Sequence, residues 1–468
     1  MSPIRHLPSR SGPALAAALA LSLVACAGGV AEPPAPSTSG ATAPGASEDG
    51  SEPAPEVTLE GRGITADGCV QPAGGRSTPG NGCIYLGVLA GLTLEAAGEF
   101  APLAQRAVVD FWAAVNAAGG IGGLDVDVET FLRDTADDPV LHVQRYLEIA
   151  PEVLLIAHSW GTATTVALLG ELAEDRMLAA PVSAWSGVHV PDGSPWLLPT
   201  SAHPACLAPM LGLDWFAEQV RPVEGVHAVV AAGPVGEEVA VGVRTWAERN
   251  GVAFLGTSVR GPDATGDDPG DVIVPAVLDS GADVVVLGVD PATTAEVIRR
   301  VADVAPLGSI LFVGVGSSWS PSALQTPAAA ALIGFYTHVA PWEDFLGDAP
   351  GHAAMRAAFG QSMPLNSGYA AGWIGQYPVR ALLEAMVASG DASPEHLARL
   401  ATDLEVTYEG ILPDTRGRAG AARDIERSAV IGRVNPESEN GLDMLAEGYR
   451  GTTAGAFDLR VPCVPLAP

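Results

Sequence analysis

The sequence predicts an α/β protein made of two doubly wound lobes, each built on a parallel sheet. Short apolar runs alternate with stretches of helical periodicity, and this alternation restarts after about residue 204. Strands that are apolar on both faces and alternate with helices are typical of parallel sheets covered on both sides. The part of the chain expected to fold, from about residue 65 to 468, is also longer than one hydrophobic core usually covers.

The first half of this region contains four expected strands and the helices between them. Apolar runs predict strands over 84–90, 124–132, 153–158 and 177–183. A helix should follow the first strand, because apolar residues recur on one face from Ala104 to Val115 and Gly119 then ends the pattern. Two further helices are expected, one through VLHVQRYLEI and one after His158 to about residue 175.

The second half repeats the pattern. A helix near MLGLDWFAEQV precedes strands predicted over 226–232, 252–259, 283–289 and 309–315. In doubly wound sheets, ligands bind at the carboxyl ends of the strands. The sequence therefore predicts a binding site formed by loops that follow strands.

The amino-terminal segment indicates export. Arg5 and Arg10 precede an apolar run from Pro13 to Val24, which is too short to stay in a membrane as a spanning anchor. The run closes with LVAC, which resembles the bacterial lipobox and makes Cys26 the predicted lipidation site. We therefore expect an extracytoplasmic protein anchored to the cell membrane by lipid. The alternative is an ordinary secretory signal that ends in a chance cysteine.

Composition restricts the partners of the folded body. The net charge is −30, and all 24 basic residues are arginine. So acidic a chain is a poor match for nucleic acid or for an anionic membrane surface. The absence of lysine also excludes Schiff-base and Walker-type lysine chemistry.

The cysteines other than Cys26 number four, and an even count in an exported protein favours disulfides. Four cysteines allow three pairings. Cys69 with Cys83 would close a Gly- and Pro-rich loop before the first strand, and Cys206 with Cys463 would fix the C-terminal tail to the middle of the chain. Free thiols are the alternative. A zinc site is not expected, because the cysteines lack short paired spacings and have no nearby histidines.

Three segments near the start of the folded body are distinctive: a first strand ending in small residues, a helix ending in NAAGGIGG (116–123), and RDTADDP (133–139). On these segments the chain, from about residue 84 onward, resembles the type 1 periplasmic binding proteins, in particular the receptors for branched-chain amino acids. The likeness continues to APVSAW (180–185) and returns at 366–391.

The resemblance implies a solute-binding lipoprotein for ABC-type import, acting as a monomer with a membrane permease, without cofactor, metal or reaction. Its ligand would be amino-acid-like or of amide type. The expected parts are a signal peptide over 1–26 and a disordered tether over 27–65. Lobe I would comprise 66–200 plus 337–408, and lobe II 201–336 plus 409–468. Three strands would cross between the lobes near residues 200, 335 and 408 and act as the hinge.

The family pattern also indicates ligand-binding residues. The corner after the third strand would bind the ligand through amides at a helix start, which suit a carboxylate. Trp160 would add an aromatic wall, and the polar head of the ligand would be held after the fourth strand. In lobe II this chain lacks two residues of the amino acid receptors, a tyrosine and the acidic residue that pairs with the ammonium group of the ligand. A larger, less charged ligand beside several tryptophans therefore fits equally well. The candidates are Phe100, Ser159, Trp160, Gly161, Thr162, Ser183, Ala184, Trp185, Asp290 and Trp319.

Two other functions remain open from the sequence. The same fold can serve as a ligand sensor without transport. AHSWG (157–161) also resembles the nucleophile elbow of α/β-hydrolases, and Ser159, Asp290 and His338 occur in the order of a hydrolase triad. No His-Gly oxyanion segment precedes this elbow, however, and a short motif often matches by chance.

Overall fold

The computed structural model describes residues 59–75, 78–93, 100–190, 195–198, 203–261, 269–306, 308–341, 346–360, 367–415 and 426–466. The predicted signal peptide, the lipidation site Cys26 and most of the predicted tether lie outside these residues. Within the described part, no helix is long and apolar enough to cross a membrane.

Lobe I, as we define it here, comprises residues 59–198 and 346–415. Its strands are β1 (Ile64–Thr65), β2 (Gly82–Tyr85), β3 (Gly87–Ala90), β4 (Leu124–Asp127), β5 (Leu132–Asp134), β6 (Ile156–Trp160) and β7 (Ala179–Val182). They form two sheets, in the orders β1-β2-β4 and β5-β3-β6-β7, and every pair except β1 with β2 is parallel. Consecutive strands β2 and β3 link the two sheets through Leu86.

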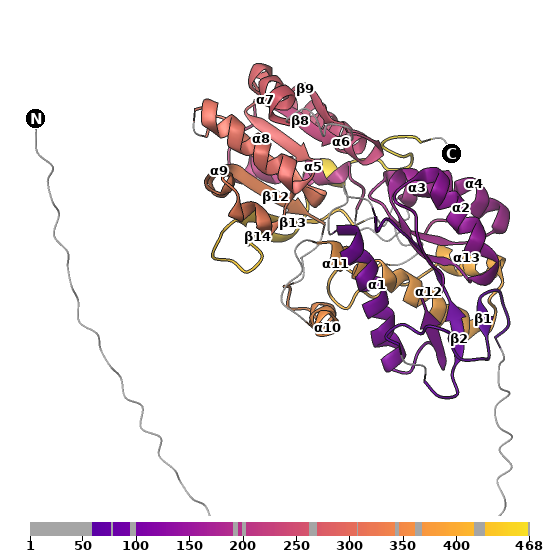
Figure 1. Ribbon diagram of the computed structural model, residues 1–468. Helices are drawn as coiled ribbons and strands as arrows, with labels where there is room; N and C mark the ends of the chain where they lie inside the picture. The colour runs from indigo at the N-terminus through magenta and orange to yellow at the C-terminus, as the bar shows by residue number, and fades with distance from the viewer. Residues whose placement is uncertain are drawn as a thin grey trace, which may run out of the picture. The chain divides into compact units, whose positions relative to one another are not determined.

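Helices cover both faces of the four-stranded sheet of lobe I (Figure 1). One face carries α1 (Phe100–Ala117), α10 (Pro350–Phe359), α11 (Gly368–Ile374), α12 (Gln376–Ser389) and α13 (Pro394–Thr402). The other carries α2 (Pro139–Ile149), α3 (Thr162–Ala167) and α4 (Leu169–Asp175). The apolar face predicted for α1 is buried, and Trp112 on it donates its indole N–H to Gln376 at 2.8 Å. Periodicity therefore located this helix and its inward face correctly.

Lobe II, residues 205–341 and 426–466, holds one seven-stranded sheet in the order β14-β13-β12-β11-β10-β8-β9. The five parallel strands are β8 (Gly225–Ala231), β9 (Ala253–Arg260), β10 (Val284–Gly288), β11 (Leu311–Val315) and β12 (Tyr336–Ala340). The last two strands, β13 (Ala429–Val434) and β14 (Leu442–Tyr449), are antiparallel. The sequence predicted a parallel sheet, and the structure differs in having these two antiparallel strands at one edge.

The helices of lobe II also lie on two faces. A core on one face includes α5 (Leu207–Gln219) and α6 (Pro234–Asn250), together with the short α14 (Thr452–Gly455). The opposite core includes α7 (Pro269–Ser280), α8 (Pro291–Val304) and α9 (Ala329–Phe335). Figure 1 shows α7 and α8 along one side of this sheet. The α/β class predicted from the sequence is confirmed in both lobes.

The boundaries between the lobes differ from those expected. Strand β1 already pairs with β2, so lobe I begins before residue 66. Strand β12 belongs to lobe II, because Tyr336 and Val339 are buried in its cores. Ile411 and Leu412 pack in the core of lobe I, so the chain leaves that lobe later than residue 408. The crossing expected near residue 200 lies outside the described residues, whereas Phe335 is the last residue of α9 in lobe II and Tyr408 packs in lobe I, so no crossing lies at those two positions.

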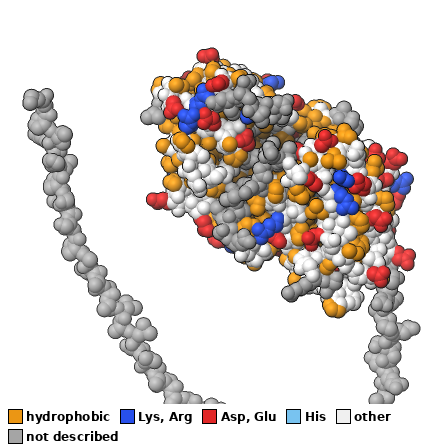
Figure 2. All heavy atoms as spheres, viewed as in Figure 1, with side chains coloured by type: hydrophobic (Ala, Val, Ile, Leu, Met, Phe, Trp, Pro, Cys, Tyr) orange, Lys and Arg blue, Asp and Glu red, His pale blue; other side chains and the backbone are white. Residues whose placement is uncertain are grey.

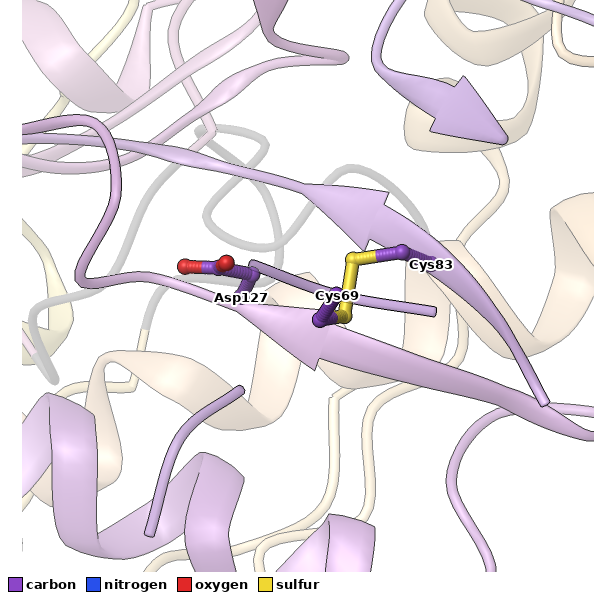
Figure 3. A group of neighbouring side chains, drawn as sticks. All are labelled: Cys69, Cys83 and Asp127. Carbon is purple, nitrogen blue, oxygen red and sulfur yellow. A yellow bond between two sulfur atoms is a disulfide. The ribbon is translucent and has the colours of Figure 1, made fainter. Parts of the chain in front are cut away.

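Two disulfides hold the ends of the folded chain, and they are the two pairings singled out from the sequence. Cys69 is bonded to Cys83 on β2, and Cys206 at the start of α5 is bonded to Cys463 in the C-terminal tail. Figure 3 shows the first disulfide with Asp127, which lies on the neighbouring strand β4. The second closes a loop with a sequence separation of 257 residues.

Candidate ligand-binding site

The carboxyl ends of β3, β5 and β6 meet at one edge of the lobe I sheet. Asp134, at the end of β5, joins two of the loops there, because its Oδ1 accepts hydrogen bonds from Leu92 N at 2.9 Å and from Ala136 N at 3.0 Å. Burial acts to raise the pKa of Asp134, but hydrogen bonds from Ala136, Thr93 and Leu92 outweigh it and lower that pKa. This carboxylate is therefore ionised and fully used in shaping the edge.

Trp160 and Phe100 form an aromatic pair at the same edge. Their ring centroids are 5.8 Å apart, and both side chains are partly exposed. The indole also crosses the backbone at Gly91, where an added Cβ would come within 2.6 Å of Trp160 Cδ1. Glycine at that position lets the ring lie flat against the loop after β3. Of the four aromatic residues predicted to bind the ligand, Phe100 and Trp160 are the two that are partly exposed.

A register shift in β6 determines which side chains face this edge. Gly87 pairs with Ile156 but the next residue, Val88, pairs with His158, so one extra residue is accommodated in β6. Such a bulge reverses the alternation of the side chains that follow it. Ser159 consequently points to the α2 face of the sheet, while Trp160 points to the α1 face with Phe100.

The hydroxyl of Ser159 is part of a buried polar chain. Its Oγ lies 3.0 Å from His142 Nε2 and 3.0 Å from Thr165 Oγ1, and His142 Nδ1 lies 3.1 Å from Thr135 Oγ1. Ser159 and His142 are fully buried, and burial lowers the pKa of His142 to about 4. The prediction that the Ser159 side chain binds the ligand is therefore corrected: it holds α2 and α3 against the sheet.

The residues after β6 and β7 are joined to each other. Gly161 has a φ of 90° and donates its N–H to Val182 O at 3.3 Å. Thr162 Oγ1 and Ser183 Oγ, both buried, lie 2.6 Å apart. Ala184 accepts a hydrogen bond from Ala205 N at 2.8 Å and so links this loop to lobe II. These hydrogen bonds join the loop after β6 to the loop after β7.

Trp185 and Trp319, both predicted to flank the ligand, belong to hydrophobic cores. Trp185 is 3% exposed and donates its indole N–H to Val464 O at 2.8 Å, which anchors the C-terminal tail. Trp319 is 7% exposed and stacks on Tyr336 with centroids 5.8 Å apart. Both expectations are corrected, because each ring is already packed on both sides by protein.

Asp290 also has a structural role. It is the N-cap of α8 and accepts hydrogen bonds from Thr293 N at 2.9 Å and Thr293 Oγ1 at 2.6 Å. His338 Nδ1 lies 3.0 Å from Tyr336 OH in the lobe II sheet. The three members of the alternative triad thus have separate partners, and Ser159 lies in the other lobe.

One residue at this edge was missed from the sequence. Asp137 belongs to the RDTADDP segment quoted above, but that segment served only as a mark of likeness. In the structure its backbone has a φ of 56°, and an added Cβ on Gly161 would overlap Asp137 Oδ1. The carboxylate therefore lies directly over the corner that follows Trp160. The sequence shows three aspartates in this segment, but it does not show which of them lies at this corner.

Among the described residues, two groups could be mistaken for metal sites. They are Cys69, Cys83 and Asp127, and Cys206, Glu238 and Cys463. In each group the two cysteines form a disulfide and so present no thiolate to a metal. Figure 3 shows this for the first group.

Residues 84–440 match the family model described as periplasmic binding protein. The chain belongs to this family. A search of curated proteins finds no match. This binding protein nevertheless has many relatives among solved structures.

Three of those structures differ in the ligand that is named for them. A fatty acid ABC transporter substrate-binding protein from Thermomonospora curvata is 20% identical, with a TM-score of 0.71 over 82% of this chain and 96% of that chain. A branched-chain amino acid ABC transporter protein from Thermus thermophilus with bound valine is 14% identical, with a TM-score of 0.65 over 80% and 98%. A solute-binding protein from R. palustris in complex with 4-hydroxybenzoate is 18% identical, with a TM-score of 0.65 over 79% and 97%.

At these identities the similar structures establish the type 1 fold of this binding protein and leave its ligand undetermined. The family is a solute-binding one and not an enzymatic one. The elbow-like sequence around Ser159 fits that conclusion, because a serine sealed between sheet and helices cannot reach a substrate. Phe100 and Trp160, by contrast, are partly exposed at this edge.

Proposed function

We propose that this protein is an extracytoplasmic, lipid-anchored receptor that captures a small solute between its lobes and delivers it to an ABC permease. The observation that carries the proposal is the partly exposed Phe100–Trp160 pair at the carboxyl edge of the lobe I sheet. Ligands of α/β sheets bind at such edges, and an aromatic wall provides both contact area and shape. The similar structures include a substrate-binding protein of a fatty acid transporter, one with bound valine and one in complex with 4-hydroxybenzoate, so we expect the side chains at this edge to determine the ligand.

The test begins with protein purified under native conditions, from which the retained solute is identified by mass spectrometry. Trp160→Ala should then weaken binding of that solute about tenfold or more, since the loss of an aromatic wall costs at least about 1.4 kcal/mol. Trp196→Ala is the matched control, because Trp196 is another partly buried tryptophan of lobe I. Equal affinity in the wild type and in Trp160→Ala, measured by calorimetry, would contradict the proposal.

The anchor is tested separately. Cys26→Ser should release the protein from the membrane, because the lipid on Cys26 is proposed as its sole attachment and the described part contains no spanning helix. The measurement is the fraction of protein that sediments with membranes. A variant that still sediments with them would show that something other than this cysteine attaches the chain.

A further inference from the structure

Glu238 on α6 has its carboxyl group beside the disulfide that holds the C-terminal tail. A carboxylate oxygen lies within 4.8 Å of the Sγ atoms of Cys206 and Cys463. The side chain is fully buried, and its Oε1 accepts hydrogen bonds from the backbone N–H and the hydroxyl of Ser186. Oε2 makes no hydrogen bond of normal geometry with the residues that the structure describes. One oxygen of this group is therefore available to carry a proton in the vicinity of the disulfide.

The other disulfide has an acid of a different kind beside it. Asp127 lies at the same limit of distance from Cys69 and Cys83 (Figure 3). Its Oδ1 accepts hydrogen bonds from Glu129 N at 3.1 Å and Thr130 N at 2.9 Å, and its Oδ2 accepts one from Thr130 Oγ1 at 2.7 Å. Both oxygens of Asp127 are thus used by donors, whereas Glu238 has one that is not.

The two sulfur atoms beside Glu238 differ in how well a reagent can reach them. Cys206 is 0% exposed at the start of α5, whereas Cys463 is partly exposed in the tail. Thiol–disulfide exchange begins when a thiolate attacks one of the two sulfurs, and access decides which one. An external thiol would therefore attack Cys463 and release the sulfur of Cys206 in a buried place beside Glu238.

A buried carboxyl group can supply the proton that the released sulfur needs. Burial raises the pKa of Glu238 to about 7, although Ser186 and the backbone N–H groups of Cys206 and Val464 act to lower it. The group is therefore largely protonated below neutral pH. An unpaired thiolate in a buried place is unfavourable, so a proton donor at this point lowers the barrier to cleavage.

The tail that Cys463 holds also contacts lobe I. Cys463 N donates a hydrogen bond to Ser186 Oγ at 2.7 Å, and Trp185 Nε1 donates one to Val464 O at 2.8 Å. Leu466 packs against a hydrophobic core of the same lobe. The disulfide is thus the covalent attachment in lobe II of a segment that also binds lobe I.

We propose that Glu238 and the Cys206–Cys463 disulfide form a site of thiol–disulfide exchange, at which a thiol reductant detaches the tail from lobe II. The thiolate of the reductant attacks Cys463 Sγ and forms a mixed disulfide. The bond between the two cysteine sulfurs breaks, its electron pair leaves on Cys206 Sγ, and that sulfur takes the proton of Glu238. A second reductant thiolate then attacks the reductant sulfur of the mixed disulfide, and Cys463 leaves and takes a proton from water. The protein disulfide is reduced to two thiols while two reductant thiols are oxidised to one disulfide.

The titration of Glu238 is governed by its burial and by uncharged donors, which are the largest influences on its pKa. His189, which follows Ser186, and His203, which precedes Cys206, are both buried, and burial lowers the pKa of each. Neither histidine gains charge as the pH rises. Helix α3 carries no charged residue. The other charged residues on α5, α6 and the tail are Asp214, Glu218, Glu237, Arg244, Glu248, Arg249, Asp458 and Arg460.

The test follows reduction of the native wild type by 2-mercaptoethanol, with alkylation and peptide mass mapping to report each cysteine. A neutral thiol is chosen because the chain carries a net charge of −30 and Figure 2 shows acidic side chains spread over the visible face, which would repel an anionic one. The Cys206–Cys463 bond should be reduced about tenfold or more faster than the Cys69–Cys83 bond, with the mixed disulfide on Cys463. Equal rates for the two bonds, or a mixed disulfide on Cys206, would overturn the proposal.

Glu238→Gln tests the proton donor, because it keeps the size of the side chain and removes the proton. At about pH 6 it should slow reduction of the Cys206–Cys463 bond about tenfold or more, and this difference should shrink as the pH rises to about 8. Glu237→Gln is the matched control and should leave the rate unchanged, since Glu237 is the exposed neighbour on the same helix. A merely structural role would have the opposite sign, because a destabilised variant opens and is reduced faster. Equal rates in the wild type and in Glu238→Gln at about pH 6 would contradict the role of Glu238.

Two further measurements need only the wild type. Its rate of reduction, divided by the fraction of thiol present as thiolate, should fall as the pH rises through about 7, and a constant quotient would exclude Glu238 as the donor. Reduction should also speed amide hydrogen exchange in residues 185–190, and unchanged exchange there would show that the disulfide does not hold the tail against lobe I. Solute binding enters none of these experiments, so their failure would leave the proposed function standing.

Discussion

Replacing Cys206 and Cys463 together with serine should lower the free energy of unfolding by roughly 5 kcal/mol. The disulfide closes a loop with a sequence separation of 257 residues, and the entropy that a cross-link removes from the unfolded chain grows with loop length. It also holds the tail in place, where Cys463 N donates to Ser186 Oγ at 2.7 Å and Trp185 donates to Val464 O. Loss of the bond therefore frees a segment that contacts both lobes.

The matched control is the serine pair at Cys69 and Cys83, whose separation is only 14 residues. The same relation predicts roughly 3 kcal/mol for that pair. Denaturant unfolding of both double variants measures the difference. If both double variants lost the same free energy of unfolding, the account of the Cys206–Cys463 disulfide as a long-range cross-link would be contradicted.

The second large effect is a pH dependence of stability caused by Glu238 on α6. Glu238 is fully buried, and its Oε1 accepts hydrogen bonds from the backbone N–H and the hydroxyl of Ser186 in lobe I. Burial raises the pKa of Glu238 to about 7, although hydrogen bonds from Ser186 and from backbone groups oppose the rise. The folded state thus binds this proton more tightly than the unfolded state, whose reference pKa is 4.5.

The sign follows from proton linkage. Stability contributed by protonated Glu238 is complete below about pH 4.5 and is lost as the pH rises to about 7, by roughly 3 kcal/mol. Buried histidines act in the opposite direction, because the pKa of His142 and of His158 is lowered to about 4 and their contribution is lost as the pH falls. The Glu238 effect must therefore be obtained as the difference between the wild type and Glu238→Gln across this pH range.

Glu237→Gln is the control for that difference, because Glu237 precedes Glu238 on the same helix and is exposed. It should leave the pH dependence of unfolding unchanged. Identical pH profiles in the wild type and in Glu238→Gln would show that the buried carboxyl does not titrate between pH 4.5 and 7.

Much of the fold could be predicted from the sequence, because its signals are local. Runs such as VHAVVAA correspond to β8, and the apolar face from Ala104 to Trp112 is the buried face of α1. The antiparallel strands β13 and β14 were missed, since pairing direction depends on distant partners. The late exit from lobe I was missed for a similar reason: Ile411 and Leu412 belong to a core that is assembled from segments far apart in the sequence.

The site was less predictable, because it depends on where side chains point. One extra residue in β6 sends Ser159 to the α2 face and Trp160 to the α1 face beside Phe100, and no periodicity in AHSWG reveals that shift. Trp185 and Trp319 are as apolar as Trp160 in the sequence, and only packing separates core tryptophans from a partly exposed one. Asp134 and Asp138 accept hydrogen bonds from nearby backbone N–H groups and Asp137 lies at Gly161, differences that depend on the folded loop and not on the residue type.

Hydrogen–deuterium exchange, with and without the solute retained on native purification, tests most directly whether a ligand binds between the lobes. The account predicts slower exchange at residues 133–139 and 158–164 of lobe I together with residues after β8, β10 and β11 of lobe II. Both sets follow the carboxyl ends of parallel strands, where a ligand enclosed by two such lobes makes its contacts. Protection confined to one lobe, or to segments away from these strand ends, would contradict it.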